Sequence, residues 1–523
     1  MNLLLTDGLV YDGSGNPPRR MDILLRDGII RQIEPGGSTV FPGVTRTDLH
    51  GLSVSPGWID VHAHSDASLF AAPEAFGKIS QGVTTEISGN CGLSAFPVLT
   101  GEVREHLRTL YEVYDFSPDW TDFSSYAEAL TARGPAVNTA FLCGHNTLRA
   151  NVSGYENRQL PADALAEMQR VLDTAMRQGA LGLSTGLLYT PGCFSDETEL
   201  LALLRTAGAS GGIYATHLRS EGDKLEEALE EALTLAENAA LPLQISHLKT
   251  ALPRNWHKLD AVLNQIETAR ARGIRIAADR YPYTYSQTSL SIVLAAPYDA
   301  MTDAAIRSVL QHDHAAYERA RLDLENSTRD WSRVILTQSR AQCAAGLAGK
   351  NLLDAAGLRQ RTPAELVMEI LREDAPGSMA AFGGMSEENL RRILERDWVS
   401  CGTDETARPV DFTFGTSHPR GFGSFPRYIR LLREHGVPME KIIQRITAQP
   451  AAFFHLSGRG VIRPGAAADL VVFNEEELDS EADFTSPHTP AAGIRSVYVN
   501  GVAAYDGELR QVVARPGRVL KRQ

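Results

Sequence analysis

The sequence predicts an α/β fold with a parallel (β/α)₈ barrel at its centre. Two observations support this prediction. Eight short apolar or β-branched runs are each followed by polar residues and a helical pattern, which is the order of elements in a parallel barrel. In addition, polar residues able to carry chemistry stand where these runs end. The carboxyl ends of barrel strands meet at one face, so we expect those residues to lie together.

The eight predicted strands lie between residues 54 and 404. Between the fifth and the sixth, Leu225, Leu229 and Leu233 recur at helical spacing against a Glu-rich face, which predicts an amphipathic helix over residues 223–240. The strands span, in order, residues 54–64, 83–88, 137–145, 180–187, 213–218, 243–248, 274–283 and 398–404.

The two ends of the chain show a different pattern. Both alternate apolar and polar residues between turn signals, which is typical of β-hairpins. We therefore expect one small β-sandwich domain formed by residues 1–54 and 455–523, with the catalytic barrel at 55–454 inserted between them. About a hundred residues separate the seventh predicted strand from the eighth, so we expect an inserted capping subdomain at 286–340.

Composition limits the function classes. The chain has 523 residues, of which 43% are hydrophobic and 22% charged, as in ordinary globular proteins. Its formal net charge of −13 disfavours nucleic acid and anionic membranes as partners, so small molecules are the expected partners. The five cysteines are scattered, and neither a signal peptide nor a membrane-spanning run is evident, so we expect a cytoplasmic protein without a disulfide framework.

Two histidines end the first predicted strand. His62 and His64 are two positions apart, so on a strand both imidazoles share one face and can bind one cation. A second His-x-His pair, His312 and His314, runs into a charged helical pattern, where the two rings diverge. We expect a metal site at the first pair and a solvated surface at the second.

Further candidates stand at other strand ends. His217 and His247 occupy matching places on consecutive strands, and imidazole is the commonest metal ligand. Cys91 lies in a turn after the second strand, where a thiolate ligand is favoured over an inert buried thiol, because thiolate with two imidazoles suits zinc and leaves a fourth position for water. Asp404 ends the last strand, and its role as a helix N-cap is the weaker alternative.

Several longer motifs are more specific. The string Pro56-Gly57-Trp58-Ile59-Asp60-Val61-His62-Ala63-His64, the later histidines and Asp404 resemble the amidohydrolase superfamily. Other strings look like its N-acyl-D-amino-acid deacylase (D-aminoacylase) branch. They include Gly89-Asn90-Cys91-Gly92, Gly182-Leu183-Ser184-Thr185-Gly186-Leu187, Thr216-His217-Leu218-Arg219, Ser246-His247-Leu248-Lys249, Tyr281-Pro282-Tyr283 and His418-Pro419-Arg420. The resemblance runs from about residue 1 to residue 520.

This resemblance implies a TIM-type barrel of the metal-dependent hydrolase kind. It also implies zinc-dependent hydrolysis of N-acyl-D-amino acids by zinc-activated water. It assigns a tight zinc to Cys91, His217 and His247, and a second, weaker metal position to His62 and His64 with the shared cysteine. It gives Asp404 the role of general base and general acid. Residues matching positions that hold the substrate carboxylate are Lys249, Tyr283, Arg420 and Tyr189.

The sequence departs from the branch pattern in places. Glu86-Ile87-Ser88, Arg280 and Tyr285-Ser286-Gln287 are atypical, which leaves the side-chain preference of the enzyme open. The same metal site could also act on a cyclic amide or on a dipeptide with a C-terminal D residue. Less favoured alternatives are an amidase with Cys91 as nucleophile, which leaves the co-facing histidines unexplained, and a non-catalytic scaffold, which would be expected to lack ligands.

Overall fold

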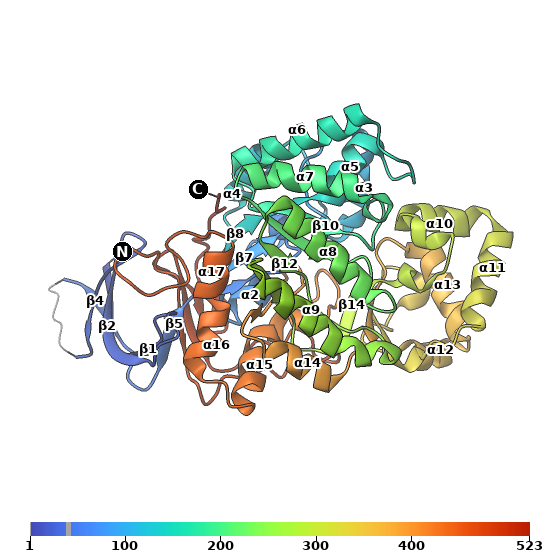
Figure 1. Ribbon diagram of the computed structural model, residues 1–523. Coiled ribbons are helices and arrows are strands. Elements are labelled where there is room, and N and C mark those ends of the chain that lie inside the picture. The colour runs from blue at the N-terminus through green and yellow to red at the C-terminus, as the bar shows by residue number, and fades with distance from the viewer. Residues whose placement is uncertain (1, 38–42, 523) are drawn as a thin grey trace.

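The computed structural model describes residues 2–37 and 43–522 and confirms the barrel (Figure 1). Its strands run in parallel in the order of the chain, within two hydrogen-bonded sheets, β6-β7-β8 and β9-β10-β11-β12-β13-β17. Leu142 alone separates β8 from β9, and we treat the two as one barrel strand. The strands are β6 (Trp58–Asp60), β7 (Val83–Ser88), β8 (Asn138–Phe141), β9 (Cys143–Gly144), β10 (Gly182–Gly186), β11 (Ile213–His217), β12 (Leu243–Ile245), β13 (Ile276–Asp279) and β17 (Val399–Ser400).

The barrel closes between its first and last strands, just beyond their carboxyl ends. The backbone N–H of Asp404 donates to the carbonyl of His62 at 2.7 Å, and that of His64 donates to the carbonyl of Glu405 at 3.2 Å. Ala63 and Glu405 form a parallel bridge. The two histidines and the aspartate are therefore brought together by the backbone that closes the barrel.

Helices surround the strands, as Figure 1 shows. The helix expected over residues 223–240 is α8 (Leu225–Ala239), and its predicted apolar positions Leu225, Leu229 and Leu233 are buried. Helices of the barrel part are α1 (Ser68–Ala71), α2 (Phe76–Ile79), α3 (Gly101–Leu110), α4 (Phe123–Arg133), α5 (His145–Ser153), α6 (Ala162–Gln178), α7 (Glu197–Ala209), α8, α9 (Leu259–Ala271), α14 (Glu387–Leu394), α15 (Arg420–Glu434), α16 (Met439–Ile446) and α17 (Ala448–Phe453).

A hydrophobic cluster joins the strands to a C-terminal helix. Strand residues such as Ile59, Ile87 and Ile213 pack in one cluster with Phe453 and Phe454 at the end of α17. The partly buried Leu520, near the C-terminus, packs against the same cluster. The interior of the barrel is therefore packed with apolar side chains rather than open.

Strands from both termini join in one nine-stranded sheet. Its order is β21-β20-β19-β18-β5-β1-β2-β3, with β4 paired to β1. Residues 54–56, which we expected to open the first barrel strand, lie instead in β5 of this sheet, and the barrel strand begins at Trp58. The strands are β1 (Asn2–Val10), β2 (Arg19–Arg26), β3 (Ile29–Pro35), β4 (Thr45–Asp48), β5 (Ser53–Pro56), β18 (Leu470–Phe473), β19 (Ile494–Val499), β20 (Val502–Asp506) and β21 (Gln511–Val512).

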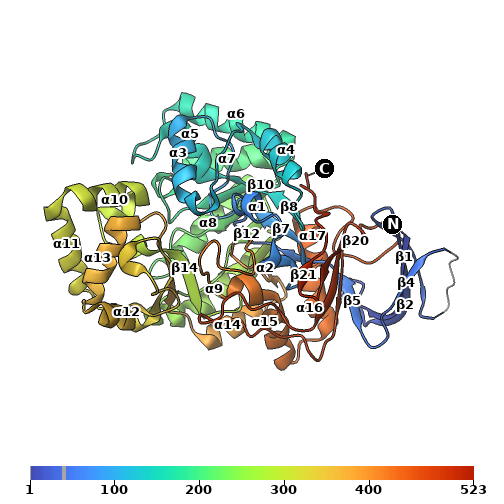
Figure 2. The same cartoon turned by 180° about the vertical axis from the view of Figure 1, so that it is seen from behind.

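An insertion follows β13 and has its own hydrophobic cluster. It combines a three-stranded antiparallel sheet, β14-β16-β15, with four helices, and it continues past residue 340, where we expected it to end. Figures 1 and 2 place these helices (yellow) at the end of the molecule opposite the N-terminal strands (blue). The elements are β14 (Tyr285–Ser289), α10 (Asp303–His312), α11 (His314–Glu325), β15 (Val334–Gln338), α12 (Leu352–Arg359), α13 (Pro363–Asp374) and β16 (Met379–Gly383).

Two further expectations concern the whole chain. Among the described residues, no helix has the length and apolar character needed to cross a membrane. The exposed His312 and His314 lie at the junction of α10 and α11, as expected for a solvated pair. The domain boundaries at 54/55 and 454/455 and the cytoplasmic location stay predictions.

Candidate metal centre and active site

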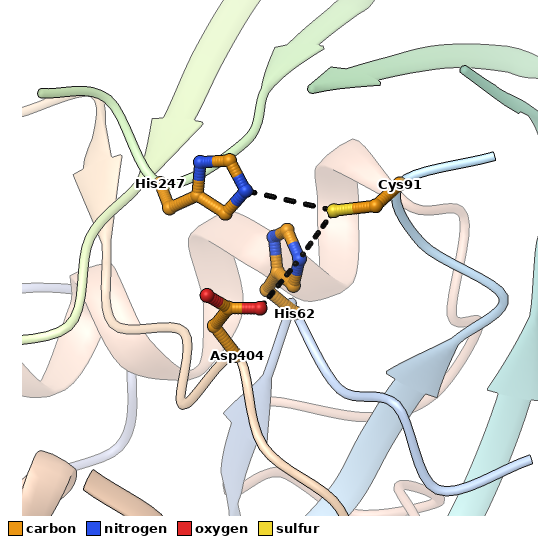
Figure 3. Close-up of side chains that lie close together, drawn as sticks. All are labelled: His62, Cys91, His247 and Asp404. Carbon is orange, nitrogen blue, oxygen red and sulfur yellow. Dashed lines mark hydrogen bonds and ion pairs between the residues drawn. The ribbon is translucent and has the colours of Figure 1, made fainter. Parts of the chain in front are cut away.

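The predicted metal ligands meet at the carboxyl ends of the barrel strands. His62 and His64 follow β6, Cys91 follows β7, His217 ends β11 and His247 follows β12. Figure 3 shows Cys91, His62, His247 and Asp404 pointing toward one another. All of the ligand candidates are buried except His64, whose side chain is 23% exposed.

Cys91 contacts two of the histidines of this cluster. Its Sγ is 3.3 Å from His62 Nε2 and 3.5 Å from His247 Nε2. Burial alone would raise the pKa of the thiol, but His62 and His247 outweigh burial and hold the pKa well below its usual value. The thiolate, which is the form that binds metals, is therefore favoured.

The turn that carries Cys91 is tightly held. Cys91 has a φ of +53°, in the left-handed region, between two glycines that also have positive φ. The N–H of Gly89 donates to Asp66 at 3.1 Å, and the N–H of Gly92 donates to Ser184 at 3.1 Å. These bonds fix the direction in which the thiol points.

His217 is buried, yet neither of its ring nitrogens has a hydrogen-bond partner among the described residues. Its ring centroid is 4.5 Å from that of His247 and 4.9 Å from that of Tyr189. An unpartnered buried imidazole is costly unless something else binds it. A cation beside His247 would satisfy the ring of His217.

The donor set fits a metal ion. Two overlapping groups of side chains have ligand atoms that all lie within 4.8 Å of one another. Sulfur and imidazole nitrogen are the donors that zinc prefers, and carboxylate oxygen is also accepted. The groups are His62, Cys91, His247 and Asp404, and His217, Glu221 and His247.

Asp404 lies against both the histidines and a cation of the protein. Its Oδ1 is 3.1 Å from His64 Nε2 and 3.4 Å from His62 Nε2, and its Oδ2 accepts from Arg420 at 2.7 Å. Burial raises the pKa of this carboxyl, but Arg420 and the two histidines outweigh burial and hold the pKa well below its ordinary value. The carboxylate is therefore ionised at neutral pH and can accept a proton.

Of the four residues expected to hold a substrate carboxylate, three contact residues of this centre directly. Lys249 Nζ lies 2.8 Å from His247 Nδ1, Arg420 binds Asp404, and Tyr189 packs on His217. The hydroxyl of Tyr189 is 3.4 Å from that of Thr288 in β14, so the insertion contributes to the wall of the site. Tyr283 lies further from the metal ligands: its ring packs on His418, and its hydroxyl donates to Pro419 at 3.5 Å.

Two carboxylates behind the histidines were missed by sequence reasoning. Glu221 Oε1 is 2.9 Å from His247 Nδ1, and Asp279 Oδ1 is 3.1 Å from His62 Nδ1. Asp279 is the last residue of β13, but the predicted strand ran on to residue 283, so Asp279 did not stand at a predicted strand end. Glu221 lies in a loop four residues after His217, and that spacing carries no signal of its own.

His418 was quoted in a motif but given no role. The backbone N–H of Arg420 donates to His418 Nδ1 at 3.0 Å, so the ring proton is on Nε2, which lies 3.1 Å from the carbonyl of Tyr285. Burial first and Arg420 second hold the pKa of His418 well below its ordinary value, so the ring is neutral. His418 thereby joins β14 to the segment that positions Arg420.

The atypical residues take structural contacts. Glu86 is buried, 3.4 Å from Lys78 and bonded by the hydroxyl of Ser65 at 2.8 Å. Arg280 is also buried; it donates to the carbonyl of Tyr283 at 2.7 Å, and its guanidinium lies over the ring of Tyr281 at 4.1 Å. Among the described residues Arg280 forms no ion pair with a carboxylate, so its contacts do not by themselves identify a substrate side chain.

A barrel with sulfur, imidazole and carboxylate side chains at its strand ends defines the class of metal-dependent hydrolases. Comparison with known proteins agrees: the amidohydrolase family matches residues 46–505. The chain belongs to this family.

Relatives resemble the chain over its full length. It is 34% identical to a D-aminoacylase and 33% identical to an N-acyl-D-glutamate deacylase, both from Alcaligenes xylosoxydans xylosoxydans. Each match covers 100% of this chain, with 98% and 97% of the respective relative. The crystal structure of N-acyl-D-glutamate deacylase from Bordetella bronchiseptica, complexed with zinc and a phosphonate inhibitor that mimics the tetrahedral intermediate, matches with a TM-score of 0.82 and 31% identity. That match covers 100% of this chain and 99% of the other.

Proposed function

We propose that this enzyme hydrolyses the amide bond of N-acyl-D-amino acids to a carboxylate and a free D-amino acid, with zinc as its metal. The observation that carries the proposal is the cluster of Asp404 with Cys91, His62 and His247 at the strand ends, in which Asp404 also lies 3.1 Å from His64. Similarity over the full chain to deacylases that act on D substrates supports the choice of substrate.

We assign the tight zinc to Cys91, His217 and His247. The lowered pKa of Cys91 supports this set, as does the lack of a hydrogen bond to either ring nitrogen of His217 among the described residues. His62 and His64, with the shared cysteine, would hold a second and weaker metal position. Zinc, when bound, supplies a Lewis acid that polarises the amide carbonyl and lowers the pKa of water to about 7.

Asp404 carries the proton in this proposal. Its carboxylate accepts a proton from the attacking water and returns it to the amide nitrogen, which cannot leave as an unprotonated anion. His64 and Arg420 hold the two oxygens at 3.1 and 2.7 Å, so the carboxylate is oriented before the substrate binds. Such orientation lowers the entropic cost of reaching the transition state.

Lys249, Arg420, Tyr283 and Tyr189 would hold the substrate. Lys249, beside His247, and Arg420, beside Asp404, offer charge-assisted hydrogen bonds to the free carboxylate. Tyr189 stands between His217 and Thr288, where it can limit the space for the acyl group or the side chain. Fixing the carboxylate and the carbonyl leaves one direction for the third substituent, and this selects one enantiomer.

The experiment that tests the proposal measures amine release from paired N-acetyl-D- and N-acetyl-L-amino acids. Enzyme is used as purified, after removal of metal by a chelator, and after zinc is added back. We expect turnover of D substrates that disappears with the metal and returns with zinc. Turnover that survives metal removal and is abolished by thiol alkylation would point to Cys91 as a nucleophile. Inactivity of the zinc-loaded enzyme on the whole panel would contradict the proposal and favour cyclic amides or D-containing dipeptides.

A further inference from the structure

The nitrogen of His247 that faces away from Cys91 has two neighbours with opposite demands. Lys249 Nζ is 2.8 Å from Nδ1, and Glu221 Oε1 is 2.9 Å from the same atom. An ammonium group can only donate to this nitrogen, whereas a carboxylate can only accept from it. One ring nitrogen cannot satisfy both neighbours at once.

The choice between these neighbours decides where the ring proton lies. If Lys249 donates to Nδ1, the single proton of the neutral ring is on Nε2, the atom that lies 3.5 Å from Cys91 Sγ. A histidine binds a metal through a nitrogen without a proton. Zinc binding through Nε2 therefore requires the proton on Nδ1, with an acceptor beside it.

Glu221 is placed to supply that acceptor and also to occupy the lysine. Its side chain is 14% exposed, and Lys249 Nζ donates to its Oε1. Its second oxygen, Oε2, is 3.7 Å from His217 Nε2. A carboxylate can accept several hydrogen bonds, so Glu221 can accept one from the Nδ1–H of His247 and another from the ammonium group of Lys249 at the same time.

We propose that Glu221 is a positioning residue that holds His247 in the tautomer able to bind zinc and keeps Lys249 from stabilising the other tautomer. The proposal rests on the ligand role of His247 in the proposed function. It also joins two parts of the site, because the lysine expected to hold the substrate carboxylate is bonded to the residue that orients a metal ligand.

The test is the zinc dissociation constant of Glu221→Gln, measured by competition with a chromogenic chelator. The change keeps the shape of the side chain but removes its charge and half of its accepting capacity. We expect zinc binding to weaken about 10- to 100-fold, the usual effect of losing such a partner of a ligand histidine. The matched control is Glu231→Gln, which removes a carboxylate from the neighbouring ion pair with Arg219 and should leave the constant within about twofold.

A second background separates orientation of His247 from general damage. In Lys249→Met no ammonium competes for Nδ1, but Glu221 still accepts from it, so adding Glu221→Gln should weaken zinc binding by about two- to tenfold relative to Lys249→Met alone, a smaller loss than in the parent. Equal zinc affinity for Glu221→Gln and the parent would overturn the proposal. So would an equal loss in both backgrounds, because the lysine would then play no part.

Two other outcomes, misfolding of Glu221→Gln and failure of the proposed function, can be distinguished from failure of this proposal. If Glu221→Gln does not fold, the double variant, which leaves no buried lysine unpaired, is compared with Lys249→Met: weaker zinc binding supports the proposal and equal binding overturns it. Zinc titration uses no substrate, so inactivity of the parent enzyme toward N-acetyl-D-amino acids would contradict the proposed function without changing this measurement.

Discussion

At the scale of single residues, Asp404 combines two properties that a proton carrier needs. Its carboxylate is ionised, and both of its oxygens are fixed. Asp404→Asn keeps the shape but cannot accept the proton, so we expect kcat to fall by about 10²- to 10⁴-fold while zinc content is retained. Steady-state kinetics on the preferred D substrate checks this. The same change at the exposed Asp411 should have no effect, and a variant Asp404→Asn that keeps most of its kcat would mean that another group moves the proton.

Glu86 gives the protein a defined pH dependence of stability. Burial raises the pKa of Glu86 to about 7, from an ordinary value of 4.5, although Lys78 opposes the rise. Between these pH values the unfolded chain loses the proton while the folded protein keeps it, so unfolding releases a proton and stability falls as pH rises through this window. The loss is complete above the folded pKa.

Glu86→Gln removes this titration. Relative to the variant, we expect the free energy of unfolding of the parent to fall by on the order of 2 kcal/mol between pH 4.5 and pH 7.5. Chemical denaturation across that range checks it. The control is Glu128→Gln at an exposed position. Its free energy of unfolding should change with pH in the same way as that of the parent. Parallel curves for the parent and Glu86→Gln would show that Glu86 is ionised throughout.

The sequence predicted the first layer of the site better than the layer behind it. Cys91, His217, His247 and Asp404 could be selected because each stands at the end of a predicted strand, and barrel geometry brings strand ends together. Glu221 could not be selected, since its position depends on how a loop folds back over His247. Side chains that act through another side chain leave no periodic pattern in the sequence.

At the scale of elements, the turn after β7 decides where the thiol lies. Gly89 has a φ of +78°, and a Cβ at this position would lie 2.1 Å from the carbonyl oxygen of Leu142, a backbone atom that cannot move aside cheaply. Gly89→Ala should therefore displace Cys91. We expect loss of bound zinc and a clear fall in Tm, measured by metal analysis and thermal unfolding.

Gly134 provides the matched control for Gly89. It also has a positive φ, of +63°, but an added Cβ would meet nothing within 4 Å. Gly134→Ala should cost only the backbone strain, about 1–2 kcal/mol, and should keep its zinc. If both variants keep zinc equally well, the turn tolerates displacement and the clash at Gly89 is relieved elsewhere.

The elements themselves were predictable to different degrees. The helix at α8 followed from its apolar spacing, because a 3.6-residue period is a local property. Residues 54–56 were placed in the wrong sheet, because Gly57 alone separates β5 from β6 and the turn signal Pro56-Gly57 was read as part of one continuous strand. The end of the insertion was also missed: β16 pairs with β14 about ninety residues earlier in the chain, and such pairing has no local signal.

At the scale of the whole molecule, the C-terminal segment belongs to the barrel as well as to the sheet of the termini. After β21 it returns to the barrel strands, where the N–H of Gly517 donates to Pro135, that of Leu520 to Thr139 and that of Arg522 to Gly179, at 2.8–2.9 Å. These partners stand before or at the start of β8 and β10, the amino ends of their strands. The segment therefore covers the face of the barrel opposite the metal centre.

Because of this placement, we expect the C-terminal segment to contribute to the stability of the protein but not to its activity. Deleting residues 514–523 exposes the strand starts and part of the cluster around Leu520, so we expect Tm to fall by several degrees. Zinc content and kcat/KM, measured well below the lowered Tm, should stay within about threefold, because chemistry in this fold takes place at the other face. Deleting only residues 521–523 removes the contacts of Arg522 and should give a smaller fall in Tm. A large loss of kcat/KM in a folded truncated protein would mean that the covered face also controls the geometry of the metal ligands.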